Sequence, residues 1–467
     1  MNNYLDESLC HDPIHGYIPF VSGKQANSGE ITERDIIDSS WVQRLRQIHQ
    51  LQTAWWVYPT AEHTRFQHVL GVMSLASRVV KQLYPSLKET CPDTPSIAYV
   101  DLLMRMAGLL HDVGHGPFGH FFDSQFLSEY DLTHEKLGAY IIENELNELL
   151  SGLRRTPNGE LKLSEKLDPA QIAWLIQRPK DDDSGDDRPK WLSHLRCLLS
   201  GIYTIDNMDF VLRDAYMTGY SQRSFDLDRL LHYSFFTEKG LTIHDRGMWS
   251  LIRFMNVKAE LFHSIYFHRE VMAIDKTLED LFRDSKQLLF PGNPLNHLEQ
   301  YCGFTEFSLL VDVGRWKTSE DPLKKKLGKR WDQLLHRNVH WKFICERKQG
   351  FSDGSQEEQN IFSDEEVAEF KLRKQLPEEL REMPLKLAVS RYIYRPNTQG
   401  PAKRQNFLYD SGLNEIKDLT TDQIFRNLPN SRHLCRIYAE DKTHAAELSK
   451  ALDSLFGGQG KDDLTNM

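Results

Sequence analysis

The stretch LLHDVGHGPFGHFFD, residues 109–123, concentrates side chains that bind metals and transfer protons. His111 and Asp112 are adjacent, and neighbours on a regular helix point about 100° apart, so both can face one ion only where the helix ends or distorts. The glycines and the proline that follow supply such an ending. An imidazole beside a carboxylate suits a divalent ion such as Fe, Mn or Zn.

More histidines and aspartates crowd the same region, interleaved with phenylalanines. The polar members of this cluster are His111, His115, His120, His134, Asp112 and Asp123. Imidazole and carboxylate groups packed against Phe118 and Phe122 would be costly to bury without a metal ion or an anion to satisfy them. A solvated polar loop is the simpler alternative, but it does not explain the aromatic residues between the histidines.

Two further segments complete a pattern. His68 begins an apolar helical stretch, and Asp206 opens another, with Asp209 three positions later. The order H…HD…D resembles that of the HD-domain metal-dependent phosphohydrolases, and in particular the branch of the deoxynucleoside triphosphate (dNTP) triphosphohydrolases. This resemblance implies a metal site made by His68, His111, Asp112 and Asp206.

Other segments resemble the same branch in the same order: DPIHGYI from Asp12, QRLRQIHQL from Gln43, TRFQH from Thr64 and LTHE from Leu132. Together they cover much of the first 275 residues. The resemblance implies that three histidines contact phosphates and transfer protons, while an aspartate orients one of the imidazoles. These catalytic residues are His115, His120, His134 and Asp123.

The resemblance also implies a nucleotide pocket. Arg65 and Lys258 would contact phosphate, and the sugar would be lined by Gln50, Leu51, Asp214 and Tyr266. Two substrate-binding positions depart from the family: Asn207 replaces a basic residue, and Phe210 replaces a tyrosine and so cannot donate a hydrogen bond. We expect these changes to weaken dNTP binding more than they affect phosphoester hydrolysis itself.

A regulatory nucleotide site is implied as well. Asp38, Gln43 and Arg46 match residues of a guanine site in the family, although His11 stands where asparagine is expected. The segment RNVHWK, with Arg337 and Lys342, resembles one that contacts a regulatory nucleotide between subunits. It ends a basic run, residues 323–343; a charge run by itself is most often a solvated helix face, but with this resemblance we favour a nucleotide effector.

Apolar residues at helical spacing predict amphipathic helices through the first two thirds of the chain. The predicted helices span residues 35–56, 68–83, 99–110, 134–150, 192–202, 206–218 and 253–282. Short strands are predicted at 16–20 and 240–244, and an acidic, exposed loop at 179–189. Asp209 and Arg213, four residues apart, are predicted to form a salt bridge on one helix rather than a catalytic pair.

Strand patterns at 385–394 and 432–439, followed by a helix at 442–456, change the character of the C-terminal third. The predicted fold is therefore mainly α: a helical HD-domain core with a smaller α+β C-terminal lobe. We place the core and an N-terminal regulatory segment at 1–303, the lobe at 304–456 and a flexible tail at 457–467.

Composition narrows the function. The 57 Lys and Arg residues against 67 Asp and Glu give a net charge of −10, which disfavours a protein that coats nucleic acid or an anionic membrane. Six scattered cysteines indicate a reducing compartment. No apolar run reaches the ~18 residues of a membrane span, and no signal peptide is apparent, so we expect a cytoplasmic protein without a membrane partner.

The leading hypothesis is a nucleotide phosphohydrolase that converts a dNTP to the deoxynucleoside and triphosphate. The expected cofactor is one divalent metal ion (Fe, Mn, Zn or Mg), with a second such as Mg accompanying the nucleotide. The expected partners are a nucleotide substrate, a nucleotide effector and further copies of the chain as a dimer or tetramer. Alternatives are an HD phosphatase or phosphodiesterase acting on other nucleotides or oligonucleotide ends, and a nucleotide-sensing or nucleic-acid-binding module with a structural metal site.

Overall fold

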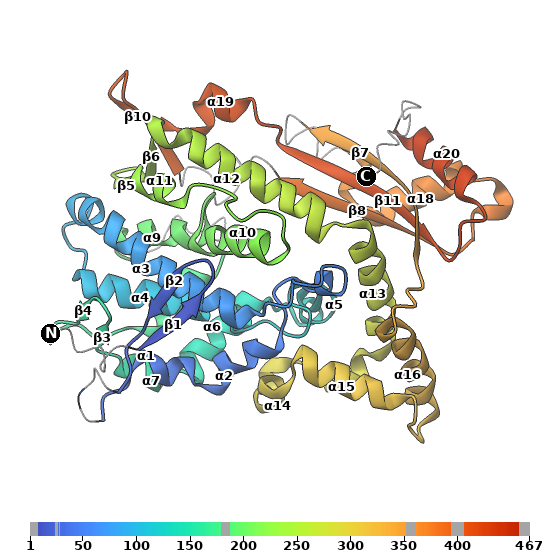
Figure 1. Ribbon diagram of the computed structural model, residues 1–467, viewed down its shortest axis with the longest axis horizontal. Coiled ribbons are helices and arrows are strands. Elements are labelled where there is room, and N and C mark those ends of the chain that lie inside the picture. Colours follow the sequence, from blue (N-terminus) through green and yellow to red (C-terminus); the bar gives the residue numbers. More distant parts are fainter. Residues whose placement is uncertain are drawn as a thin grey trace. The chain divides into compact units, whose positions relative to one another are not determined.

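In the computed structural model of the protein, the described residues are 8–23, 27, 29–178, 187–351, 360–393 and 406–456 (Figure 1). The chain divides into two compact units. The first contains Met1–Val257, Gln287–Val311 and Asn397–Phe425, and the second contains Lys258–Lys286, Asp312–Pro396 and Arg426–Met467. The predicted tail and most of the predicted acidic loop lie outside the described residues.

Helices make up most of the first unit, which confirms the prediction of a mainly α fold. Helices that lie in it, or begin in it, are α1 (Glu33–Ile37), α2 (Ser40–Gln43), α3 (Arg65–Thr90), α4 (Ile97–Leu110), α5 (His120–Gln125), α6 (His134–Asn144), α7 (Asn147–Gly152), α8 (Pro169–Ile176), α9 (Lys190–Ser200), α10 (Ile205–Met217), α11 (Leu227–His232), α12 (Met248–Leu261), α14 (Leu298–Gly303), α15 (Glu306–Trp316) and α19 (Gln423–Arg426).

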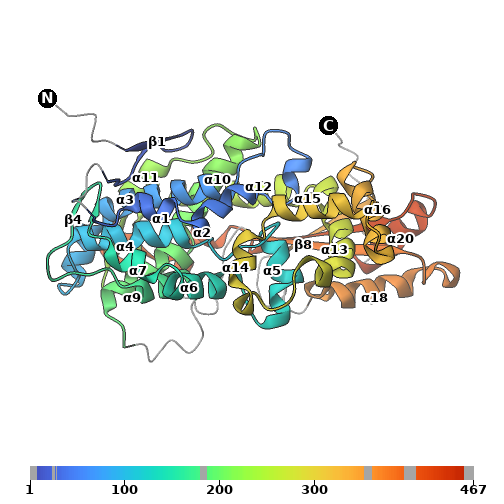
Figure 2. The same ribbon diagram turned by 90° about the horizontal axis from the view of Figure 1, so that it is seen from below.

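Three of these helices form the centre of the first unit. α3 and α4 lie side by side in both ribbon views, and α10 packs against α3 (Figures 1 and 2). Each helix begins at a hydroxyl-bearing residue: Thr64 forms a capping box with Gln67, the Ser96 hydroxyl accepts from the Tyr99 amide, and Thr204 accepts from the Asn207 amide. These caps fix where the helices start, and therefore which residues lie in the first turns.

The strands of the first unit form small sheets. A hairpin joins β1 (Leu9–Asp12) to β2 (Gly16–Pro19), and β3 (Arg155–Thr156) pairs with β4 (Gly159–Glu160). A four-stranded sheet has the order β10-β9-β6-β5. Its strands are β5 (Ser234–Thr237), β6 (Gly240–His244), β9 (Asn406–Asp410) and β10 (Glu415–Asp418), and β6 and β9 run parallel although they are far apart in sequence.

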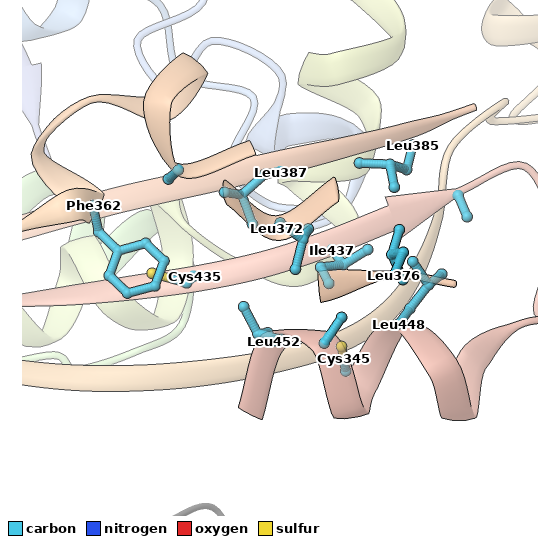
Figure 3. Close-up of a cluster of buried hydrophobic side chains, with 13 residues drawn as sticks. Cys345, Phe362, Leu372, Leu376, Leu385, Leu387, Cys435, Ile437, Leu448 and Leu452 are labelled. Atoms are coloured by element: carbon cyan, nitrogen blue, oxygen red, sulfur yellow. The ribbon is translucent and has the colours of Figure 1, made fainter. Parts of the chain in front are cut away.

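The second unit is built on an antiparallel sheet of order β7-β11-β8, formed by β7 (Lys342–Phe351), β8 (Leu385–Ile393) and β11 (Ser431–Ala439). Its helices are α16 (Pro322–Leu335), α18 (Glu365–Gln375), α20 (Ala445–Leu455) and most of α13 (Arg269–Leu289). Alternate residues of β11, such as Cys435 and Ile437, pack with Leu372 of α18 and Leu448 of α20 in one apolar cluster (Figure 3).

The four predicted strands are confirmed as β2, β6, β8 and β11, but three predicted helices are wrong in extent. Residues 35–56 form α1, α2 and two 3-10 turns, because extended backbone at Ser39 separates the helices and Gln52 has a φ of 50°. Residues 134–150 form two helices, α6 and α7. The helix predicted at 253–282 is interrupted by a π-helical turn, Phe262–Tyr266.

The compact units do not follow the predicted division at residue 303. Residues 258–286 group with the C-terminal sheet, whereas β9 and β10 group with the first unit, since β9 pairs with β6. The domain boundaries at residues 303 and 456 stay a prediction.

None of the helices in the described part of the chain is both long and apolar enough to cross a bilayer.

Candidate metal centre

The predicted metal ligands come together at the meeting point of α3, α4 and α10. His68 lies in the first turn of α3, and Asp206 lies in the first turn of α10. The His68 Nε2 atom is 3.1 Å from Asp206 Oδ1 and 4.0 Å from Asp112 Oδ2. Ligand atoms that each lie about 2 Å from one ion are about 3 to 4 Å apart, so this spacing fits a single divalent ion.

His111 and Asp112 follow the last turn of α4, which ends at Leu110. The His111 Nδ1 atom donates to the Gly108 carbonyl oxygen at 2.9 Å, which directs Nε2 toward the carboxylates. That Nε2 lies 3.3 Å from Asp112 Oδ1 and 3.7 Å from Asp206 Oδ1. The helix end therefore lets two adjacent residues face one point, as their sequence predicted.

The donor set fits a divalent cation by its chemistry. The His111 Nε2 atom is buried and makes no hydrogen bond. Although burial opposes protonation of His68, hydrogen bonds to Asp206 and Asp209 raise its pKa to about 10. Desolvation opposes ionisation of Asp206, but the imidazoles of His111 and His68 lower its pKa. The clustered carboxylates thus favour positive charge at the point that a metal ion would occupy.

A second cluster, formed by His115, His120, Asp123 and His134, is next to the first. Asp123 Oδ2 accepts from His134 Nδ1 at 2.5 Å and from His120 Nδ1 at 3.3 Å. The rings of His115 and His134 stack with centroids 3.7 Å apart. Asp112 links the two clusters, because its Oδ1 atom is 3.4 Å from His115 Nε2.

Charge in this second cluster is set by its neighbours. Burial lowers the pKa of His115 well below its usual value, and the charges of Arg65 and His134 lower it further. Burial opposes ionisation of Asp123, but His115 and His120 hold its pKa below the usual range. These shifts favour a neutral imidazole at His115 beside an ionised carboxylate at Asp123.

Arg65, predicted to contact phosphate, is buried at the start of α3. Its Nη1 atom donates to Asp112 Oδ2 at 2.6 Å, and its charge holds the pKa of Asp112 well below normal against the opposing effect of burial. The guanidinium passes Gly119, where φ is +57° and a Cβ would lie 2.3 Å from Arg65 Nη2. Gly119 is needed both for the turn and for this close approach.

The predicted sugar-pocket residues of the first unit lie on two segments. Gln50 and Leu51 follow the 3-10 turn after α2, and the Gln50 Oε1 atom is buried without a hydrogen bond. On α10, the Asn207 side chain donates to the capping oxygen of Thr204 at 2.6 Å, and Phe210 is half-buried. Asp214 Oδ1 accepts from His63 Nε2 at 2.7 Å.

Lys258 and Tyr266, the remaining predicted substrate residues, belong to the second unit. Lys258 lies near the end of α12, and Tyr266 lies in the π-helical turn, where its ring meets Phe262 edge to face. Their contacts with a nucleotide stay predictions.

Two of the predicted regulatory residues share a cavity of about 750 Å³ in the first unit, lined also by Trp41 and Glu145. In this cavity Gln43 Oε1 accepts from Arg46 Nε at 2.8 Å. Asp38 ends α1 and pairs with Arg34 at the surface. Arg337 follows α16 and Lys342 begins β7, both in the second unit, and their regulatory role stays a prediction.

Two residues that the sequence did not single out as site residues, His63 and Asp209, contact predicted ones, and a third, His15, contacts Asp209. His63 holds Asp214, while Asp209 and His15 form a buried group with His68. The salt bridge between Asp209 and Arg213 is confirmed, at 2.9 Å. The spacing from Asp206 to Asp209 was the available signal, since residues three apart share a helix face. His15 lies in the DPIHGYI segment that resembles the family, but nothing in that segment indicated its contact with Asp209, and no local pattern indicated His63.

Comparisons with known proteins agree with this geometry. Residues 65–177 match the family model of the HD domain. The chain is 26% identical over 461 residues to deoxynucleoside triphosphate triphosphohydrolase SAMHD1 of Homo sapiens, covering 92% of this chain and 70% of that protein. It is 27% identical over 341 residues to the uncharacterized protein YwfO of Bacillus subtilis, covering 70% of each chain.

The same fold occurs in a crystal structure of a hypothetical protein from Aquifex aeolicus. The two structures superpose with a TM-score of 0.65 over 96% of this chain and 100% of that chain, at 20% sequence identity. The arrangement of helices and sheets is therefore shared beyond the HD domain itself.

Proposed function

We propose that this chain is a metal-dependent phosphohydrolase that converts a dNTP to the deoxynucleoside and inorganic triphosphate. The proposal is supported by the match to the HD-domain model and by the confirmed resemblance to the dNTP triphosphohydrolases. The coarser activity, metal-dependent phosphoester hydrolysis, has the wider support from the family model and the relatives. The dNTP substrate and its products are the finer part of the proposal.

One observation carries the proposal: a metal-ligand cluster and a proton-transfer cluster share Asp112. Its Oδ1 atom lies 3.3 Å from His111 Nε2 on one side and 3.4 Å from His115 Nε2 on the other. Phosphoryl transfer requires positioning and charge neutralisation more than covalent chemistry. A site that places cation ligands beside a neutral imidazole meets both needs.

The roles proposed for the residues follow their positions. A divalent ion held by His68, His111, Asp112 and Asp206 would supply positive charge that polarises a phosphoryl oxygen. Arg65 binds a phosphate from the adjacent side. The histidines of the second cluster transfer protons: His120 and His134 are both held by Asp123, and the ring of His115 stacks on that of His134.

The departures at Asn207 and Phe210 shape the substrate proposal. The Asn207 amide is already engaged with Thr204, and a phenylalanine ring at 210 offers no hydroxyl. We expect weaker dNTP binding than in relatives with a cation and a phenol at these positions, and less dependence on the 3′-hydroxyl. Leu51 is proposed to crowd a 2′-hydroxyl, which would keep deoxynucleotides favoured over ribonucleotides.

Assembly and regulation form a separate part of the proposal. The resemblance of the chain to the dNTP triphosphohydrolases implies a nucleotide effector and a homo-oligomer. The cavity that holds Gln43 and Arg46 offers a place for a guanine base in the first unit. We propose at least a dimer, whose larger forms depend on nucleotide, and a cytoplasmic location.

The deciding experiment incubates the purified protein, supplied in turn with Mn²⁺, Fe²⁺, Zn²⁺ or Mg²⁺, with each dNTP and NTP alone and in mixtures, and separates the products by chromatography. We expect a deoxynucleoside and triphosphate, formed only with metal. Release of orthophosphate, or turnover of monophosphates or oligonucleotide ends, would instead support the phosphatase or phosphodiesterase alternative. Tight nucleotide or RNA binding without turnover would support the sensing module.

A further inference from the structure

Asp209 lies one turn after Asp206 on α10, outside the predicted ligand set, yet it is one of the most tightly bound side chains of the first unit. It is fully buried and accepts four hydrogen bonds. Oδ1 accepts from His15 Nε2 at 2.6 Å and from Arg213 Nη2 at 2.9 Å. Oδ2 accepts from His68 Nδ1 at 2.7 Å and from Arg213 Nε at 2.9 Å. With all four acceptor positions filled, the carboxylate has one orientation.

This fixed carboxylate determines which nitrogen of His68 is available to a cation. A carboxylate can only accept, so His68 must carry a proton on Nδ1, and Nε2 is the nitrogen that can bind a metal ion, which would displace its proton. That Nε2 atom is the one that faces Asp206, at 3.1 Å. Partners of this kind, behind a metal-binding imidazole, set both its tautomer and its ring orientation.

The β1–β2 hairpin holds Asp209 from the other side. Asp12 Oδ1 accepts from the backbone amides of Ile14 and His15, at 2.9 and 2.8 Å, which shapes the turn that carries His15. Asp12 Oδ2 accepts from Arg213 Nη1 at 2.7 Å. Both ends of the turn are thus bound to α10, one through His15 and Asp209 and the other through Asp12 and Arg213.

α3 packs closely against the side chains of Asp209 and Arg213 at Gly71. Gly71 follows His68 by about one turn, and a Cβ at this position would lie 2.1 Å from Asp209 Oδ1 and 2.2 Å from Arg213 Nη2. Any side chain at residue 71 must therefore displace the pair. A substitution here disturbs the network without removing a charge or a donor.

We infer that Asp209 is a positioning residue of the metal centre. The β1–β2 hairpin contributes to metal affinity as well, because its His15 and Asp12 bind Asp209 and Arg213. The inference rests on the proposed function, because it assumes that His68 binds a metal ion. It adds a route by which a change at the N-terminal hairpin alters the centre without touching any ligand.

The test measures the dissociation constant for Mn²⁺ by isothermal titration calorimetry, without nucleotide. We expect Asp209→Asn to bind Mn²⁺ about 10- to 100-fold more weakly than the parent chain. The asparagine amide can donate to His68 Nδ1, which would leave the proton on Nε2 where the metal should bind. The absorption bands of bound Co²⁺ should change as well, since a rotated imidazole alters the ligand field.

A matched control is Glu33→Gln. Glu33 is also fully buried and bound by one arginine, Arg105, at 2.6 and 2.9 Å, but it has no contact with a predicted ligand. This control should lose stability but keep the Mn²⁺ dissociation constant of the parent. Within the hairpin, Tyr17→Ala is the corresponding control, because Tyr17 is exposed and takes no part in the network.

If Asp209→Asn does not fold, His15→Gln and Gly71→Ala supply the test, and both should weaken Mn²⁺ binding, by less than Asp209→Asn would. Parent-like Mn²⁺ affinity in the folded variants overturns the inference while leaving the proposed function intact. A parent chain that binds Mn²⁺ but hydrolyses no nucleotide contradicts the proposed function alone. A parent chain that binds no divalent ion overturns both.

Discussion

Around α3, α4 and α10 the first unit buries a network of polar side chains among apolar ones, whereas the side chains that pack together on α18, α20 and β11 of the second unit are apolar. The first holds buried carboxylates, imidazoles and guanidinium groups, including Glu33, Arg105, Asp209 and Arg213. The apolar cluster of the second unit brings together Leu372 of α18, Leu448 of α20 and Ile437 of β11 (Figure 3). The apolar cluster contributes mainly to folding stability, whereas the buried polar network mainly fixes the orientation of side chains.

Energetics explain the difference. Each large apolar side chain buried in the second unit contributes about 1.5 to 3 kcal/mol to folding. Buried ion pairs such as Arg105 with Glu33 contribute much less to the free energy of folding, because desolvation offsets most of their attraction. Asp209 and Arg213 therefore do more for the position of His68 than for the stability of the fold, because Asp209 accepts a hydrogen bond from His68 Nδ1.

The largest effect should come from removing a metal ligand. We expect His111→Ala to lower bound metal and to reduce hydrolysis by more than about 10³-fold, because even residues that only support a ligand are worth about 10- to 100-fold. The helical content should not change. Metal analysis by mass spectrometry, product chromatography and circular dichroism measure these three quantities.

A matched control is His194→Ala, which removes a histidine stacked on Phe236, away from the centre. It should keep both metal and activity. Undiminished turnover by His111→Ala after metal depletion would refute the assignment of this cluster as a metal centre.

The complementary change breaks the apolar interior. Leu448 is fully buried, and Leu448→Ala should lower the free energy of unfolding by about 2 to 5 kcal/mol, from lost burial and the cavity left behind. Its Mn²⁺ affinity should equal that of the parent wherever the chain is folded. Urea denaturation measures the stability, with Leu323→Ala, at an exposed position on α16, as the control. A loss of metal affinity at constant folding would contradict the separation of roles.

Two substitutions in the predicted nucleotide pocket should strengthen dNTP binding rather than weaken it. Asn207→Lys together with Phe210→Tyr should restore one charge-assisted contact, worth about 1.5 to 3 kcal/mol, and one neutral hydrogen bond, worth about 1 kcal/mol. The Michaelis constant for dNTPs should fall by up to about 10² to 10³-fold. Steady-state kinetics on the single and double variants measures it. Loss of activity in the double variant, or a parent chain that prefers ATP, would argue for a different nucleotide specificity.

The smallest effect concerns assembly. We expect dNTP to shift the parent chain to larger oligomers, and Arg337→Glu to reduce this shift by replacing a cation at the predicted regulatory segment with an anion. Light scattering at increasing nucleotide concentration measures the change in mass. Lys326→Glu, an exposed position in the same basic run, is the control and should behave as the parent does. A parent chain that stays monomeric at every nucleotide concentration would contradict the oligomer proposal.

The sequence alone determined the local features. Helical periodicity predicted α3, α4, α9 and α10, and the GHGP segment predicted the helix end that turns His111 and Asp112 toward one point. These features depend on residues close together in the chain, whose backbone preferences act over a few positions. The resemblance then supplied His68 and Asp206 as the remaining ligands, which the structure brings within 3.1 Å of each other.

Tertiary structure alone decided what lies behind those ligands. His15 meets Asp209 across 194 residues of chain, and His63 meets Asp214 across 151, with no local pattern to indicate either pairing. Packing also divided the helix predicted at 35–56 and joined β6 to β9 in one sheet. Such choices depend on which buried donors and acceptors can satisfy one another once the helices have packed, and that is a property of the folded chain rather than of any segment.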